Sequence, residues 1–187
     1  MPRIAIIIFA FLLTSTSFAA EQKKYELKMS LNDTFIVKET EDWDVDVEKV
    51  LTLRFANVNI TPKNDTSFDM QLFFKCDTPD LAKFDSSEKI KKSVVSSSEQ
   101  YLPYSVETEI EVKELNVKGW YGWYTVLTDT DLANKKEIPE GEFKYMTRGM
   151  VRLSQDSVLG FSFMTNEIDG PGHKKLFDYI KSFVKRK

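Results

Sequence analysis

Apolar and polar residues alternate along several segments of the chain, as they do in strands that bury one face. The alternation is clearest over 68–76 (FDMQLFFKC), where Asp69, Gln71 and Lys75 separate apolar residues that share one side. Cys76, the last residue of that apolar side, is therefore expected to point inward. The same reasoning predicts strands over 35–37, 50–55, 108–115 and 119–127, and a hairpin made of 143–153 and 158–165 around the turn 154–157.

Two segments show the spacing of amphipathic helices instead. The first covers 85–102, where Asp85 and Glu88 approximate a capping box and Pro103 is expected to end the helix. Its apolar positions are Ile90, Val94, Val95, Tyr101 and Leu102. An earlier turn is expected to begin at Thr78-Pro79. The closing helix follows the break Gly170-Pro171-Gly172, and its apolar stripe is Leu176, Phe177, Ile180, Phe183 and Val184.

The order of these elements predicts the fold class. Strands, a helix, four further strands and a final helix are typical of an α+β protein and not of a doubly wound parallel fold. Several strands are apolar on both faces, which indicates helices on both sides. We therefore expect a central antiparallel sheet of about six strands between helices, a three-layer α/β/α sandwich.

This order resembles that of the Mog1/PsbP-like superfamily, which includes the bacterial periplasmic proteins related to DcrB. The resemblance is carried by the 68–76 strand, the 85–102 helix, the aromatic 119–127 strand, the 146–153/158–164 hairpin and the 176–184 helix. It implies a central antiparallel sheet between helices and a mostly non-enzymatic role, and it supplies no catalytic residues. DcrB-like proteins are often lipoproteins, whereas no Cys lies near the start of this chain.

The first twenty residues differ in pattern from the rest. Arg3 is followed by an apolar run over 4–13 and by small residues that end at Ala19-Ala20, before a charged segment. This pattern predicts a signal peptide over 1–20 and a single domain over 21–187. The run has about half of the roughly 20 residues that a membrane-spanning helix needs, which disfavours a membrane anchor. We expect a periplasmic or secreted protein that is not inserted in a membrane after leader cleavage.

Composition excludes several kinds of chemistry. The chain has one His and one Cys, so His173 and Cys76 would have to supply any thiol or serine–histidine catalysis, and the 68–76 pattern buries Cys76. His173 stands where a helix begins and is expected to be a surface or capping residue. Zinc sites built on His and Cys lack enough ligands. The net charge of −3 and the absence of a basic stripe argue against nucleic acid, and we predict no metal and no cofactor.

Carboxylates are the remaining candidates for chemistry. Asp42, Asp44 and Asp46 imitate the opening of a calcium loop, but Val47 replaces the required Gly, so a solvated strand face is the better interpretation. A second partial match begins at Asp129-Thr130-Asp131 and is equally incomplete. The Gly170-Pro171-Gly172 turn could present amides to an anion, although such residues are more often plain helix punctuation.

The most distinctive stretch is the aromatic strand, which we define as Trp120, Tyr121, Gly122, Trp123 and Tyr124. Alternation places Trp120 and Tyr124 on one face and Tyr121 and Trp123 on the other. These four aromatic residues are either core or a ligand- or partner-binding surface. The favoured hypothesis is an exported, non-enzymatic binding or protein-interaction module whose partner is an unknown protein or small ligand. The alternatives are a carrier of a small-molecule or cell-wall ligand, with a pocket between sheet and helix, and a carboxylate-based hydrolase that uses Asp42, Asp44, Asp129 and Asp131.

Overall fold

The computed structural model describes residues 23–30, 32–50 and 54–184 of the 187-residue chain. The predicted signal peptide lies outside the described residues, and so do positions 51–53 of the strand predicted over 50–55. Val50 and Phe55, the ends of that predicted strand, pair with each other across two antiparallel strands, so the chain reverses direction between them. The prediction of one continuous strand at this place is therefore wrong.

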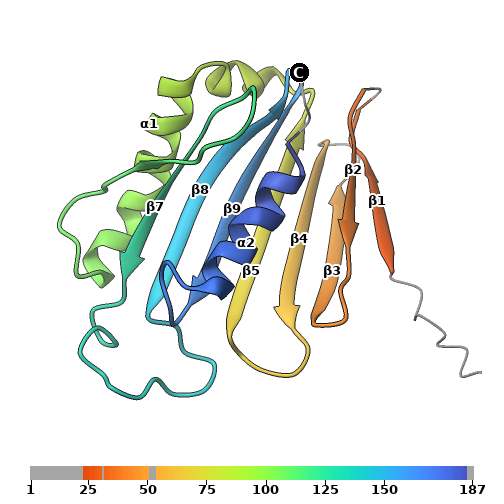
Figure 1. The fold of residues 1–187 in the computed structure, drawn as a ribbon. Coiled ribbons are helices and arrows are strands. Elements are labelled where there is room, and N and C mark those ends of the chain that lie inside the picture. Colours follow the sequence, from red (N-terminus) through yellow and green to blue (C-terminus); the bar gives the residue numbers. More distant parts are fainter. Residues whose placement is uncertain (1–22, 31, 51–53, 185–187) are drawn as a thin grey trace, which may run out of the picture.

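Seven of the described strands form one antiparallel sheet, in the order β3–β4–β5–β9–β8–β7–β6 (Figure 1). Their bounds are Trp43–Val50 (β3), Phe55–Pro62 (β4), Phe68–Cys76 (β5), Ser157–Thr165 (β9), Tyr145–Ser154 (β8), Gly122–Thr128 (β7) and Lys113–Glu114 (β6). The antiparallel α+β prediction is confirmed. The expected number of about six strands is too low, because the pattern analysis misses β4, in which buried Val58 lies between Asn57 and Asn59.

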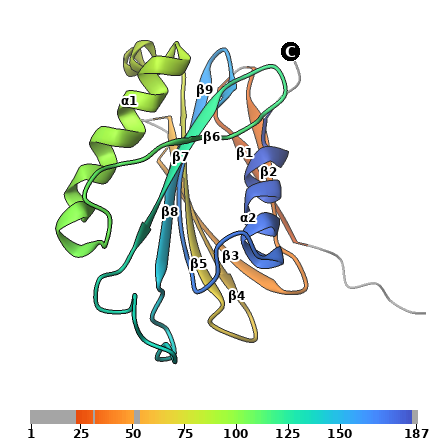
Figure 2. The same cartoon turned by 60° about the vertical axis from the view of Figure 1, so that its left-hand side comes forward.

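The two α-helices of the described ranges lie on opposite sides of this sheet, as Figure 2 shows. The helix α1 (Ser87–Ser98) contacts β7 and β8, and we call that side of the sheet the α1 face. The helix α2 (Pro171–Ser182) lies on the other side, which we call the α2 face, together with a separate hairpin of β1 (Lys24–Lys28) and β2 (Thr34–Lys38).

The α2 face holds the main hydrophobic core. Strand alternation brings one apolar set from each long strand to this side, and the predicted inward set of β5 is confirmed as Phe68, Met70, Leu72, Phe74 and Cys76, all buried. The predicted stripe of α2 is confirmed at Leu176, Phe177, Ile180 and Phe183, which are buried against the same cluster. From the hairpin, Leu27, Phe35 and Val37 complete the core.

Two element ends differ from the sequence prediction. The cap of α1 is Ser86 and not Asp85, since the Ser86 side chain accepts a hydrogen bond from the Lys89 backbone N–H (3.3 Å). The α-helix ends at Ser98 and continues as a 3-10 helix, η3 (Glu99–Tyr104), which contains Pro103. Proline cannot supply the N–H that an α-helical bond would need, and the chain tightens there. The turn expected at Thr78-Pro79 is confirmed as the 3-10 helix η2 (Pro79–Phe84).

The first two strands predicted after η3 are shorter in the structure. Of the 108–115 segment only Lys113–Glu114 forms a strand, β6, and the buried Leu115 adds one backbone hydrogen bond to Gly122 (2.9 Å), whereas Ile110 and Val112 are only half-buried. Strand β7 begins at Gly122, since Gly119 adopts a φ of 83° in a turn. The hairpin of β8 and β9 is confirmed, with Gln155 and Asp156 at its turn.

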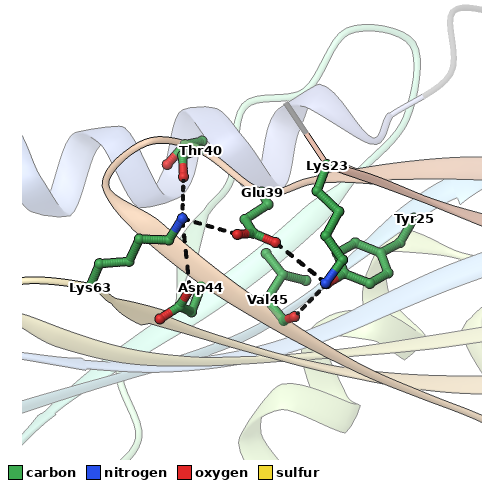
Figure 3. A network of polar contacts seen from close by, with 7 residues as sticks. All are labelled: Lys23, Tyr25, Glu39, Thr40, Asp44, Val45 and Lys63. Atoms are coloured by element: carbon green, nitrogen blue, oxygen red, sulfur yellow. Dashed lines mark hydrogen bonds and ion pairs between the residues drawn. The ribbon is translucent and has the colours of Figure 1, made fainter. Parts of the chain in front are cut away.

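Polar contacts fasten the β1–β2 hairpin to the edge of the sheet (Figure 3). The Tyr25 hydroxyl donates to the Val45 carbonyl of edge strand β3 (3.0 Å), which uses an acceptor that no neighbouring strand pairs. Glu39 accepts a hydrogen bond from Lys63 Nζ (3.0 Å), and this contact holds the pKa of Glu39 below its usual range. Lys23 lies 3.8 Å from the same carboxylate. These residues are partly exposed, so they orient the hairpin while the core beneath it supplies most of the stability.

Candidate functional site

The aromatic strand is divided between the two faces of the sheet. Tyr124 packs against Phe177 of α2, with ring centroids 4.7 Å apart, whereas Tyr121 and Trp123 pack beneath α1. The predicted alternation of Tyr124 with Tyr121 and Trp123 is therefore confirmed. Trp120 lies in the turn before β7, and all four aromatic side chains are half-buried. They do not share one surface, so a single partner could not lie across all of them.

Trp123 has a structural role at the start of α1. Its indole N–H donates to Ser87 Oγ at 2.9 Å, and Lys91 Nζ lies 4.9 Å from the centre of its ring. Trp123 thus holds the first turns of α1 against the sheet. Whether the aromatic strand also binds a partner stays a prediction.

A pocket of about 270 Å³ lies at the other end of α1, between η3 and the ends of β7, β8 and β9; we call it the η3 pocket. It is lined by Tyr101, Tyr104, Ser105, Leu127, Thr128, Asp129, Phe143, Lys144, Met146 and Met164. The chain after η3 is tied to β7 here: Ser105 forms a β-bridge with Asp129, and the Val106 N–H donates to the Thr128 carbonyl at 2.9 Å. The pocket is therefore a built feature of the fold.

The walls of the η3 pocket are mainly apolar. Leu127, Met146 and Met164 come from three neighbouring strands and form its floor, since Met146 pairs with both of the others. Tyr104 forms part of the rim and is 72% exposed, which is unusual for a large aromatic side chain on a folded domain. Lys144 and Asp129 add one charge of each sign. An apolar hollow with a few polar groups is the usual form of a small-molecule site.

Arg148 lies next to this pocket on the α1 face. Its Nη1 donates to the Tyr101 hydroxyl at 2.9 Å, and its guanidinium carbon lies 4.6 Å from the Tyr101 ring centre. Its Nε is buried and has no hydrogen-bond partner among the described residues. Two buried hydroxyls of the same region, Thr125 Oγ1 and Ser98 Oγ, also have no partner within the described part of the chain.

A second hollow surrounds the first turn of α2, as two adjoining pockets of about 250 and 280 Å³. Its walls include Trp43, Phe68 and His173, but each of these is at least nine-tenths buried and already packed. Lys175 spans the outer part, because its Nζ lies 3.1 Å from an Asp42 carboxylate oxygen and 4.8 Å from the Trp43 ring centre. Lys175 and Asp42 are thus paired with each other, and Asp65 accepts the Ser67 backbone N–H at 2.9 Å.

His173 is a core residue, and the expectation of a surface or capping residue is wrong. It is 5% exposed, its ring packs against Phe163 and Phe177, and Nε2 lies 3.1 Å from Thr147 Oγ1. Burial lowers the pKa of His173. Cys76 is confirmed as inward-pointing: its Sγ donates to Ser157 Oγ at 3.0 Å in the core. Neither residue is placed to attack a substrate.

The acidic candidates are occupied by ordinary contacts. Asp42, Asp44 and Asp46 are exposed, as predicted for a solvated strand face, and Lys175 and Lys63 lie close to the first two. Asp129 Oδ1 accepts the backbone N–H groups of Asp131 (2.8 Å) and Leu132 (3.0 Å), which shapes a turn. Within the described ranges no three His, Cys, Asp or Glu side chains are grouped in a way that could hold a metal ion.

Comparison with known proteins does not assign this chain to a family. No protein-family model matches the sequence, and no curated protein matches it. In the part of the chain that the structure describes, no helix is both long and apolar enough to cross a membrane. The functional argument therefore starts from the geometry of the η3 pocket.

Sequence reasoning named one residue of this pocket, Asp129, as a functional candidate, and named it for other chemistry. Of the rest, Tyr101 and Tyr104 are in η3, Met146 is in β8 and Met164 in β9, and Arg148 of β8 lies beside the pocket. One signal was available in β8, where Arg148 and Arg152 alternate with apolar residues although both faces of the strand are covered. A cation at a covered strand position is a reason to look for its partner.

Proposed function

We propose that this chain is an exported, non-enzymatic binding protein that takes a small ligand in the η3 pocket. The observation that carries the proposal is the pocket itself, an apolar hollow of about 270 Å³ with the exposed Tyr104 at its rim. No comparable support exists for the carboxylate hydrolase, because Asp42 is paired with Lys175 and Asp129 shapes a turn. Periplasmic or secreted location is part of the proposal and is supported by the leader pattern over 1–20.

We also propose that the fold is the three-layer arrangement of the Mog1/PsbP-like superfamily. The support is the antiparallel sheet, the order of strands and helices along the chain, and the positions of α1 and α2 in Figure 2. Members of that superfamily mostly have non-enzymatic roles, which agrees with a binding function.

Trp120 of the aromatic strand is a second proposed binding residue, for a protein partner. The support is Trp120, which lies outside the regular part of β7 and is half-buried. Substituting Trp120 by Ala should weaken capture of such a partner without lowering the melting temperature. A large loss of stability would show instead that Trp120 is part of the core.

The pocket function can be tested by NMR on protein that carries ¹³C-methyl methionine. A set of small acidic, basic and neutral organic compounds should shift the methyl signals of Met146 and Met164, which line the pocket. The methyl signal of Met70, fully buried on the α2 face, serves as the internal control. If no compound moves the two pocket signals, the proposed function is wrong.

A matched pair of rim variants locates the binding. Tyr104→Ala removes a wall of the pocket and should weaken any binding that is found. Val106→Ala changes a neighbouring exposed apolar residue that does not line the pocket, and it should bind as the wild type does. Equal binding by both variants would place the ligand elsewhere.

A further inference from the structure

We propose that the ligand of the η3 pocket is a small organic anion, a carboxylate on a compact apolar body, and that Arg148 binds its charge. This inference rests on the proposed binding function and names the class of ligand. It is carried by the position of Arg148 beside an apolar pocket and by the lack of an anionic partner for it among the described residues.

The other described arginines show what is unusual about Arg148. Arg54 is paired with the carboxylate of Asp77. Arg152 is buried, and its guanidinium donates to three backbone carbonyls, those of Ser154, Phe84 and Gln155. Arg148 has one neutral hydroxyl as its partner, and its buried Nε has none in the described chain. A guanidinium removed from water loses free energy of hydration, and an anion with two oxygens would restore it most fully.

One hydroxyl that could complete an anion site lies beside Arg148, and a second lies at the end of α1. Thr125 pairs directly with Arg148 across β7 and β8, so their side chains are neighbours on the α1 face. Ser98 is buried at the end of α1, three residues before Tyr101, which holds Arg148. The free Nε–H, the second Nη and these hydroxyls are donors, and an ionised carboxylate is a pure acceptor with room for about four hydrogen bonds.

The apolar body of the ligand would lie in the pocket next to this cluster. Met146 precedes Arg148 by two residues on the same side of β8, and Leu127 follows Thr125 by two on β7, so Arg148 and Thr125 lie on the same sheet face as the pocket floor, one side-chain position beyond it. A cavity of roughly 150 Å³ holds benzene, so about 270 Å³ holds a ring with a short chain. The charged residues that line the pocket are Lys144 and Asp129, and the Glu107 carboxylate accepts the Thr128 N–H and hydroxyl at the pocket wall (both 2.8 Å), so the preference for an anion depends on Arg148 alone.

The test compares two probes of the same shape, 3-phenylpropionate and its neutral amide 3-phenylpropanamide, by calorimetry and by the methyl signals of Met146 and Met164. The acid should bind at least about tenfold more tightly than the amide, as expected for a charge-assisted hydrogen bond. Arg148→Gln should reduce the affinity for the acid to that of the amide. Lys144→Gln, which removes the other cation of the pocket, should keep the preference for the acid.

Several results would overturn the inference. Equal affinity of the wild type for acid and amide would do so without any variant, so a folding defect in Arg148→Gln cannot hide a failure. Loss of the preference in Lys144→Gln but not in Arg148→Gln would assign the charge recognition to Lys144. If neither probe moves the two methyl signals while other compounds do, the anion inference fails and the binding function stands. If no compound moves them, both the anion inference and the binding function are wrong.

Inorganic phosphate alone should not compete with the acid, since competition would mean that the charge and not the whole ligand is recognised.

Discussion

The two faces of the sheet are built in different ways. On the α2 face, bulky side chains such as Phe74, Phe163 and Ile180 are completely buried, and the polar Thr147 and His173 contact each other. On the α1 face, α1 lies mainly over β7 and β8, and the buried Arg148 Nε and Thr125 Oγ1 have no described partner. The α2 face therefore holds the fold together, while the α1 face contains the groups that a ligand could satisfy.

Two neighbouring phenylalanines of β5, one on each face, allow the contributions of the two faces to stability to be compared directly. Phe74 is fully buried on the α2 face against Phe35 and Phe183, whereas Phe73 is half-buried on the α1 side, near Gly160 and Phe55. We expect Phe74→Ala to lower the free energy of unfolding by about 4 kcal/mol and Phe73→Ala by about 1 to 2 kcal/mol, because only the first leaves a closed cavity. Urea unfolding followed by tryptophan fluorescence measures both, and equal losses would contradict the comparison of the faces.

The local sequence pattern predicts those strands and helices in which the regular spacing of apolar residues continues over many positions. The inward set of β5 and the stripe of α2 were predicted residue by residue, because each element buries one complete face. No strand is predicted at β4, although Ala56, Val58 and Ile60 alternate with Asn57 and Asn59 and are buried. Sheet order could not be derived, because β5 lies beside β9 through pairings between distant segments.

The candidate site was less accessible to sequence reasoning for a related reason. The η3 pocket joins Tyr101, Leu127, Met146 and Met164, which only the register of β7, β8 and β9 brings together. The surface position expected for His173 is wrong because the first turn of a helix does not always face solvent. In the structure that turn of α2 leans on the sheet and buries the imidazole.

The contact that holds α1 on its face is the next feature to test. Trp123→Phe removes the indole N–H that donates to Ser87, and we expect a loss of about 1 to 2 kcal/mol in unfolding free energy. Ser87→Ala should cost a similar amount, and the double variant should cost clearly less than the sum, which a double-mutant cycle measures. Strict additivity would mean that Trp123 stabilises α1 through packing alone.

The smallest expected effect is a pH dependence of the unfolding free energy, which arises from His173 beside Thr147 on the α2 face. Burial lowers the pKa of His173 from its usual 6.5, with Lys113 acting in the same direction and Asp169 against it. The folded protein therefore binds this proton less readily than the unfolded chain, so the stabilisation is complete above about pH 6.5 and is lost as the pH falls below it. The loss at pH 5.5 should be at most about 1.4 kcal/mol.

His173→Gln isolates this contribution, because the chain has one histidine and most carboxylates titrate at lower pH. Gln can still meet the Thr147 hydroxyl but does not ionise, so its unfolding free energy should change less than that of the wild type between pH 7.5 and 5.5. Urea unfolding at several pH values gives the two curves. Parallel curves would mean that His173 accepts a proton in the folded protein as easily as in the unfolded chain. In that case the α2 face would be less closed than its buried residues indicate, and the contrast between the two faces would weaken at His173.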